Sequence, residues 1–431
     1  MNRLSTWSIR LRKLIASYPR QFWLMFCGML ISTIGSSMIW PFLMIYVSDR
    51  LGLPLAISAS LMTISSFMGL ISSFIAGPII DRLGRKWVMV FSLLLNAGGY
   101  FFLSQAHSLP MFALLMGLNG AVNPLYRVGA DAMMADLVPP EKRVDAYSLL
   151  RMSNNLGIAL GPTIGGFIAS ASYNLAFYCA AAGLSLYGLL MAVFAIETLP
   201  QHAGQAVERV AERFGGYGAV LRDKPFIRFT INFTLVQMCA ALIWVLLSVY
   251  TKHNYGISER QYGLIPTTNA LMVVFLQVAV TQVSKRFPPF KVLIVGALFY
   301  TAAVFSVALG QGFWAFWLSM VIMTSGELLL VPTSSTYVAN LAPADKRGRY
   351  MSIYGLTWSV ASGISPVGGG LLSDNLGVKA PWLGGSLVGL VSVMGFLWLS
   401  RHHPPTNLSK PTPLASISQT SQEIEQASQI Q

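Results

Sequence analysis

The feature that most constrains this chain is the recurrence of long apolar segments, which begins at Phe22 and continues almost to Leu399. A membrane hydrocarbon core about 30 Å thick needs roughly 20 apolar residues per helix, and the segments are close to that length. Only 10% of the residues are charged, whereas a soluble domain has about a quarter. A lipid bilayer is therefore the expected environment, and a sizeable soluble domain is not expected.

The apolar segments predict an all-α integral membrane protein with twelve transmembrane helices. The first segment is longer than the apolar core of a signal peptide, and no small-residue cleavage site follows it, so we expect it to be retained. The predicted spans are 22–46, 57–80, 87–106, 110–130, 145–170, 175–196, 225–250, 261–283, 290–310, 313–335, 348–372 and 380–399.

The net charge of +13 is explained by the positions of the basic residues. With the N-terminus in the cytoplasm, most Lys and Arg fall in cytoplasmic segments, as the positive-inside rule requires. This predicts a multi-pass protein of the cell (inner or plasma) membrane with both termini cytoplasmic, and it argues against a nucleic-acid partner. The remaining basic residues are Arg50, Lys252, Arg260 and Lys379 in external loops, and Arg127 and Arg151 within the membrane.

The cysteines and histidines predict neither a disulfide framework nor a metal site. Cys27, Cys179 and Cys239 are odd in number, far apart and inside apolar spans. The five histidines form no pair at metal-binding helical spacing, and no GxxxxGK phosphate loop occurs. We therefore expect no metal and no cofactor, and we disfavour a metalloprotease or an ATP-driven pump.

An internal repeat relates the two halves of the chain at a constant offset of 204 residues. Six spans per half give both halves the same orientation, which predicts two six-helix bundles related by an axis along the membrane normal. The matches include Trp40 with Trp244, Gly52 with Gly256, Arg143 with Arg347, and Pro162 with Pro366.

The repeat also sets the predicted domain boundaries. Residues 1–199 form the N-terminal bundle and residues 225–403 the C-terminal bundle. Residues 200–224 form a polar cytoplasmic linker of mixed charge, part of which is expected to lie as an amphipathic helix. The tail, 404–431, is rich in Ser, Gln, Thr and Pro and is expected to be disordered.

A loop between the second and third predicted spans contains Gly77, Asp81, Arg82, Gly84, Arg85 and Lys86. It resembles the GxxxDRxGR(R/K) loop of the major facilitator superfamily. The resemblance implies that this loop latches the two halves together on the cytoplasmic side in the outward-open state. It further implies that Asp81 faces the start of the eleventh span and that Arg85 meets Asp136. The alternative is a turn that only sets topology.

The second half lacks an intact copy of this loop. The counterparts of Asp81, Gly84 and Arg85 are, in the same order, Lys285, Pro288 and Pro289. The cytoplasmic gate is therefore expected to be asymmetric.

A glycine-rich pattern in the fifth span resembles the GxxxGPxxGG motif of the drug:proton antiporter branch, which favours efflux. Glycines four residues apart build a flat stripe for close helix contact, and a proline bends the span. The alternative is a generic packing groove. The pattern comprises Gly157, Gly161, Pro162, Gly165 and Gly166.

The RxxQG pattern expected in the fourth span of that branch is not intact. Met116, Asn119 and Gly120 stand at its Arg, Gln and Gly positions. Because the family arginine is associated with proton coupling, its loss weakens the assignment to antiport.

Four charged residues in or near the membrane are the candidates for proton coupling. A charge in hydrocarbon is costly and by default faces a cavity or a partner. Glu327 is the deepest carboxylate and is the predicted proton carrier. The alternative for Glu327 is a permanent ion pair with Arg151 or Arg127. Arg127 and Asp131 are one helical turn apart, which favours a local pair between them.

Aromatic and amide side chains are the candidates for the substrate cavity. In this fold the first and seventh spans line the cavity, and aromatic rings suit lipophilic ligands, cationic ones in particular. Single aromatics can also be interfacial anchors. The candidates are Trp40, Tyr46, Asn154, Asn155, Gln237, Trp244, Tyr250 and Trp358.

Taken together, these patterns predict a monomeric secondary transporter that exports lipophilic drugs or metabolites in exchange for protons, by alternating access. Its expected partners are a small-molecule substrate, protons and membrane lipid, with the proton gradient as energy source. One alternative is an exporter of sugar or of a lipid-like metabolite on the same fold. A non-transporting membrane sensor is an alternative of a different class. No catalytic constellation indicates an enzyme.

Overall fold

The computed structural model describes residues 16–199, 217–343 and 346–402, and regular structure within these ranges is helical. The first half comprises α2 (Arg20–Ile39), η1 (Trp40–Phe42), α3 (Leu43–Leu51), α4 (Leu55–Leu83), α5 (Arg85–Leu103), α6 (Leu109–Leu137), η2 (Pro140–Lys142), α7 (Arg143–Ala171) and α8 (Tyr173–Phe194). The second half comprises α10 (Tyr217–Leu221), α11 (Lys224–Tyr255), α12 (Glu259–Tyr262), α13 (Leu264–Ser284), α14 (Pro289–Leu309), α15 (Gly312–Leu341), α16 (Arg347–Leu376) and α17 (Ala380–His402).

Within the described ranges, nine helical segments are long and apolar enough to cross a membrane. The protein is therefore a multi-pass membrane protein. Helices α6, α7 and α16 are longer than most of these, at 29, 29 and 30 residues, but they are less apolar because they carry polar and charged side chains. The helices coincide with the twelve predicted spans to within a few residues at most ends, and the count of twelve membrane crossings stays a prediction.

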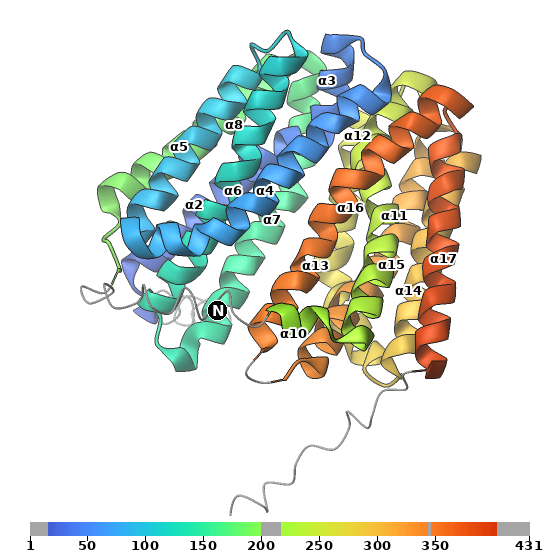
Figure 1. The fold of residues 1–431 in the computed structure, drawn as a ribbon. Helices are drawn as coiled ribbons and strands as arrows, with labels where there is room; N and C mark the ends of the chain where they lie inside the picture. Colours follow the sequence, from blue (N-terminus) through green and yellow to red (C-terminus); the bar gives the residue numbers. More distant parts are fainter. Residues whose placement is uncertain (1–15, 200–216, 344–345, 403–431) are drawn as a thin grey trace, which may run out of the picture.

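The helices form two bundles that lie side by side (Figure 1). Each bundle contains buried apolar clusters, and the cluster of the second half extends into the first. In the first half Phe22 and Tyr187 belong to one cluster and Phe112 to a second, whereas Phe229 and Tyr300 belong to the core of the second half. The cluster of the second half also includes Phe42, Met44 and Ile45 of the first half, so buried apolar contacts join the two bundles.

The bundles meet at one end of the molecule and diverge toward the other (Figure 1). We call the first the closed end; its loops join α3 to α4, α5 to α6, α7 to α8, α11 to α12, α14 to α15 and α16 to α17. The opposite open end has the loops that join α4 to α5, α6 to α7, α13 to α14 and α15 to α16. Helices α4 and α16 pack against each other across the two halves, as do α7 and α13.

Proline interrupts the first predicted span, which the sequence presented as one helix over 22–46. Helix α2 ends at Ile39, and a single 3-10 turn containing Pro41 leads into α3. Because proline lacks an N–H group and clashes with the preceding turn, a continuous α-helix through this position is unfavourable.

Several local features recur at residues 204 positions apart. Gly52 ends α3 with φ of +60°, and Gly256 ends α11 with φ of +65°; glycine adopts this left-handed cap without a Cβ clash. The guanidinium group of Arg143 donates to the carbonyl of Ala135 at 2.7 Å, and that of Arg347 donates to the carbonyl of Ala339 at 3.0 Å.

Parts of the predicted domain plan lie outside the described residues. This holds for the tail, 404–431, and for most of the linker. Of the linker, the structure describes only 217–224, in which Tyr217–Leu221 form the short helix α10 and α11 begins at Lys224.

Candidate functional site

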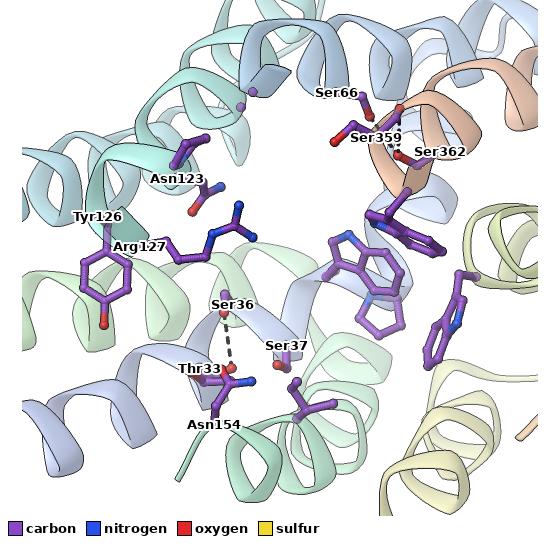
Figure 2. A pocket seen from close by; sticks show the side chains of 18 of the residues that line it. Thr33, Ser36, Ser37, Ser66, Asn123, Tyr126, Arg127, Asn154, Ser359 and Ser362 are labelled. Carbon is purple, nitrogen blue, oxygen red and sulfur yellow. Dashed lines mark hydrogen bonds between the residues drawn. The ribbon is translucent and has the colours of Figure 1, made fainter. Parts of the chain in front are cut away.

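A cavity of about 840 Å³ lies between the two bundles, and both halves contribute to its walls. Helices α2, α4, α5, α6, α7 and α8 line it from the first half, and α11, α13, α14, α15 and α16 from the second. Drug-sized ligands occupy cavities of roughly 300 to 1,000 Å³, so the space suits a small organic molecule. Figure 2 shows polar side chains of the first half on one side and part of α16 on the other.

Most of the predicted cavity residues do line this space. They are Trp40, Asn154, Gln237, Trp244 and Trp358, together with the charged residues Arg127 and Glu327. Pro162 of the glycine-rich pattern also lines it.

Tyr46 and Tyr250, which the sequence placed in the cavity, lie inside the bundles instead. The hydroxyl group of Tyr46 donates to the carbonyl of Ser104 at 3.0 Å, and the ring of Tyr250 packs on Trp382 with centroids 5.1 Å apart. Each tyrosine follows a cavity-lining tryptophan by six residues. Six residues correspond to about 240° around an α-helix, so the tyrosines point away from the cavity. Asn155 is likewise absent from the lining, although its neighbour Asn154 belongs to it.

Glu327 has an amide partner in place of an ion pair. The side-chain amide of Asn269 donates to Glu327 Oε2 at 2.7 Å and to Thr324 Oγ1 at 2.9 Å. Among the described residues, no ion pair joins Glu327 to Arg127 or Arg151. Glu327 stands near the midpoint of α15, which makes it a carboxyl group in the wall of a central cavity.

Arg127 reaches into the cavity from α6 (Figure 2). In the described part of the chain it makes no ion pair with Asp131, although the two residues are one turn apart. Asp131 and Arg151 are exposed and do not line the cavity. Of the four candidates for proton coupling, the structure therefore brings two, Arg127 and Glu327, to the same space.

Several residues of the two walls are counterparts 204 positions apart, but the chemistry of most of these pairs differs. Trp40 and Trp244 are alike, and their rings touch across the halves with centroids 5.5 Å apart. At four further positions an amide or cation of the first half corresponds to an acid, an aromatic or an aliphatic side chain of the second. These lining pairs are Asn96 with Tyr300, Asn123 with Glu327, Arg127 with Val331, and Asn154 with Trp358.

The glycine-rich pattern in α7 holds this helix close to its neighbours. A Cβ atom on Gly157 would lie 2.7 Å from Thr33 Cβ, and Cβ atoms on Gly161 and Gly165 would overlap α2 as well. Gly166 instead approaches the backbone of Glu259 in the other half. The stripe is thus a packing surface within the first half, and its last glycine lies at the contact between halves.

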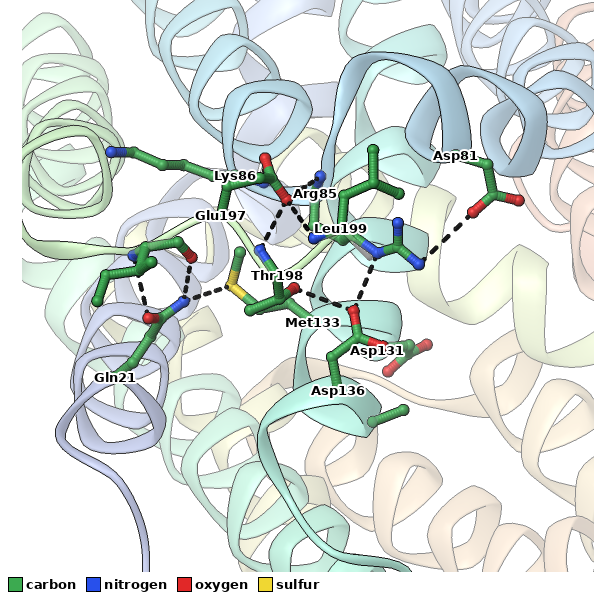
Figure 3. A network of polar contacts seen from close by, with 12 residues as sticks. Gln21, Asp81, Arg85, Lys86, Asp131, Met133, Asp136, Glu197, Thr198 and Leu199 are labelled. Carbon is green, nitrogen blue, oxygen red and sulfur yellow. Dashed lines mark hydrogen bonds and ion pairs between the residues drawn. The ribbon is translucent and has the colours of Figure 1, made fainter. Parts of the chain in front are cut away.

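The loop between α4 and α5 makes a compact polar network at the open end (Figure 3). Arg85 Nε lies 3.0 Å from Asp136 Oδ2, the contact that the family resemblance implied, and Arg85 Nη2 lies 3.7 Å from Asp81 Oδ1. These contacts join α4, α5 and α6 of the first half, whereas the implied contact of Asp81 with the start of the eleventh span stays a prediction. Lys86 places its ammonium group 4.9 Å from the ring centroid of Trp87.

Glu197 completes this network, and the sequence reasoning missed it. Its carboxylate accepts hydrogen bonds from the backbone N–H groups of Arg85 at 2.9 Å and Lys86 at 3.1 Å, at the N-terminus of α5. A carboxylate is stabilised there by the free N–H groups and the helix dipole. Gly84 has φ of +91°, and a Cβ atom at this position would overlap the Glu197 carboxylate. An acidic residue directly after a predicted span was the available signal.

At the closed end, polar contacts cross from one half to the other. Asp49 of α3 accepts from Lys252 Nζ at 2.9 Å and lies 2.7 Å from His253 Nε2. Lys252 also binds Glu259 at 2.6 Å, and the hydroxyl group of Tyr173 donates to the same Glu259 oxygen at 2.6 Å. These contacts tie α3 and α8 of the first half to α11 and α12 of the second.

Asp374, at the end of α16, binds across the closed end at the start of α4. Its carboxylate accepts from the backbone N–H groups of Leu55 at 3.1 Å and Ala56 at 2.9 Å. Gly370, one turn earlier, lies against the backbone of Ala56, because a Cβ atom there would be 2.5 Å from Ala56 Cα. The two helices are therefore in close backbone contact.

Comparison with known families agrees with this geometry. The family model described as Major Facilitator Superfamily matches residues 25–250 and again 229–426, so each half of the chain is matched. The chain belongs to the Major Facilitator Superfamily. As a member of this family it is a transporter and not an enzyme.

Two characterised relatives are similar over most of the chain. The Na(+), Li(+), K(+)/H(+) antiporter of Planococcus maritimus is 25% identical over 77% of this chain and 84% of its own. The multidrug resistance protein MdtH of Yersinia pestis (strain Pestoides F) is 24% identical over 88% of this chain and 94% of its own.

Solved structures show the same fold. A point mutant of the nucleoside transporter NupG superposes with a TM-score of 0.76 at 13% identity, over 88% of this chain and 99% of that one. A POT family transporter crystallised with a thioalcohol-conjugated peptide gives 0.75 at 17% identity, over 89% and 96%. At this identity the likeness establishes the fold alone.

Proposed function

We propose that this transporter exports lipophilic drugs or metabolites in exchange for protons, by alternating access. The observation that carries the proposal is Glu327, a carboxyl group at the midpoint of α15 in the wall of a cavity between two bundles. A carboxyl group in such a place can take a proton from one side and release it to the other as the bundles tilt, because its access to water changes with the tilt.

The proposal includes the arrangement in the membrane. Twelve helices cross the bilayer, in two six-helix bundles related by an axis along the membrane normal, and the offset of 204 residues relates their positions. The open end, which carries most of the basic loop residues, faces the cytoplasm together with both termini. The state with a closed external end and an open cytoplasmic end is the one that accepts substrate from the cell. The protein acts as a monomer, uses no cofactor, and resides in the cell membrane.

The aromatic contacts support a lipophilic substrate. Trp40, Trp244 and Trp358 line the cavity and offer flat apolar faces that tolerate ligands of different shape. The multidrug and cation/proton antiporter relatives agree with efflux and with proton exchange, but at 24% and 25% identity they do not identify the substrate. The polar wall of the first half keeps a second candidate open, export of a sugar or a lipid-like metabolite, because Ser36, Asn123 and Asn154 can bind hydroxyl groups.

The test is proton movement in vesicles that contain the purified protein and a trapped pH indicator. With an acidic interior, addition of tetraphenylphosphonium outside should release protons, and Glu327→Gln should reduce this release to the level of protein-free vesicles. Glu141→Gln, in the exposed η2 turn outside the cavity, is the matched control and should behave as the unmodified protein. Unchanged proton release in Glu327→Gln would contradict the role of this carboxyl group. A response to sugars in place of the cation would favour the second candidate.

A further inference from the structure

Two opposite charges face the cavity from different halves of the protein. Arg127 and Glu327 are the charged residues of its lining, and they stand on α6 and α15. They are not counterparts in the repeat, because Asn123 corresponds to Glu327 and Val331 corresponds to Arg127. The cavity therefore has a cationic wall and a carboxylate wall. A ligand that matches both walls has a negative group at one end and a positive group at the other.

The wall around Arg127 is rich in hydrogen-bond donors. A guanidinium group stays charged in proteins and is costly in the membrane unless something solvates or neutralises it. Arg127 makes no ion pair with any described residue. Asn123 and Asn154 each accept a hydrogen bond through the amide oxygen, from Asn96 at 2.8 Å and from Thr33 at 3.2 Å. Their NH₂ groups therefore stay available beside Arg127 for an anionic oxygen.

The wall of the second half carries aromatic rings and one carboxyl group. Tyr300, Trp244 and Trp358 line the second half, and Glu327 lies among them. Asn269 donates to Glu327 Oε2, which leaves Oε1 for a cation or a proton. An ammonium group can pair with this oxygen and also gain cation–π attraction from a nearby ring.

We propose that the cavity selects aromatic zwitterions. Their carboxylate or other anionic group binds Arg127, their ring system packs on Trp40, Trp244 and Trp358, and their ammonium group binds Glu327. This inference rests on the proposed transport function and narrows it, because a purely cationic drug leaves Arg127 without an anion. The proposal also gives Glu327 and Arg127 different roles. The ammonium group and the proton compete for the Glu327 carboxylate, which exchanges one for the other, whereas the bond to Arg127 fixes orientation and selects the substrate.

The test uses three compounds that share one aromatic body. 4′-(Aminomethyl)biphenyl-4-carboxylic acid carries both charges, its methyl ester carries only the positive one, and its N-acetyl derivative only the negative one. Binding to the purified full-length protein in lipid nanodiscs is measured by titration calorimetry. We expect the zwitterion to bind about tenfold or more tightly than either derivative, which is the usual effect of losing a charge-assisted hydrogen bond.

Two variants assign each charge to its residue. In Arg127→Gln the zwitterion should lose its advantage over the methyl ester and keep its advantage over the N-acetyl derivative, whereas Glu327→Gln should do the reverse. Arg127→Lys should retain part of the preference, which separates a charge effect from misfolding. Arg286→Gln, an exposed arginine in the loop between α13 and α14, is the matched control and should bind all three compounds unchanged.

The outcomes separate this inference from the proposed function. Equal affinities for the zwitterion and its methyl ester would overturn the inference, and so would an equal loss for all three compounds in Arg127→Gln. If tetraphenylphosphonium nevertheless drives proton release, the proposed function stands without it. If the charge preference follows the two residues but no compound moves protons, the selectivity stands and the proton exchange fails.

Discussion

The two ends of this transporter hold their polar groups in different ways. At the closed end, Asp49 of the first half binds Lys252 of the second, and Asp374 of the second half binds the start of α4 in the first. At the open end, the network around Arg85 and Glu197 joins elements of the first half. The contacts between the halves therefore favour one tilt of the bundles. The contacts within the first half instead hold its loop in the same conformation at every tilt.

The largest effect is expected where the halves touch by their backbones. Gly370→Leu places a bulky side chain against Ala56 and should force α16 away from α4. We expect transport to fall by about tenfold or more, because overpacking at a contact without space cannot be relieved locally. Spin labels at exposed positions 107 and 311, in loops of the closed end, should move apart. Labels at exposed positions 83 and 287, at the open end, should approach each other.

Gly368→Leu is the matched control for this substitution. It lies two residues away on the same helix, and a Cβ atom there has open space around it. An equal loss of transport in both variants would show that α16 tolerates leucine poorly for a reason other than its contact with α4. The difference drawn between the closed and open ends would then lose its support.

A smaller effect is expected from the ion pairs of the closed end. Asp49→Asn weakens the contacts to Lys252 and His253. Because these groups are partly exposed, each pair contributes little, and the population with the longer separation of labels 107 and 311 should grow about two- to fivefold. The same labels in molar salt should show less difference between variant and unmodified protein, since salt screens exposed pairs.

Lys379→Gln provides the reference for Asp49→Asn, because it removes an exposed charge from the same end. A population shift in this control as large as in Asp49→Asn would mean that net charge, rather than the contact between halves, sets the equilibrium.

The smallest effect on gating is expected at the open end. Glu197→Gln weakens the carboxylate cap of α5 and should lower the free energy of unfolding by about 1 kcal/mol, as loss of a helix cap typically does. The label distances should stay unchanged, because the contacts of Glu197 lie within the first half. Thermal unfolding monitored by circular dichroism gives the stability, with Glu141→Gln as the control. A shift of the label distances would show that this network also senses the tilt.

The sequence predicted the helices well because membrane spans are defined by length and apolarity, which are local properties. It also predicted the family from a loop and a glycine stripe with fixed spacing. The 3-10 turn at Pro41 was not predicted, although the proline was visible in the span, because a proline can also be accommodated inside an α-helix. Pro78, Pro124 and Pro162 lie inside α-helices.

The cavity was predicted less completely, for a geometric reason. The identity of the spans that face the cavity does not show which side of each span faces it. Tyr46 and Tyr250 point away, because each lies about 240° around its helix from the tryptophan that lines the cavity. The hydrogen-bond partners of the cavity residues were also not predicted from the sequence. Asn269 lies on a different helix from Glu327, and only the folded arrangement shows that the cavity-lining carboxyl group has an amide beside it.

The contact between Trp40 and Trp244 gives the molecule an optical signal of its own. The two indoles are 204 positions apart in the sequence and belong to opposite halves, and their ring planes are inclined by 54°. Two chromophores at this separation and angle couple excitonically, and the coupling depends steeply on both quantities. Near-ultraviolet circular dichroism of the unlabelled protein should therefore report each change of tilt in real time, without a probe that disturbs the gate.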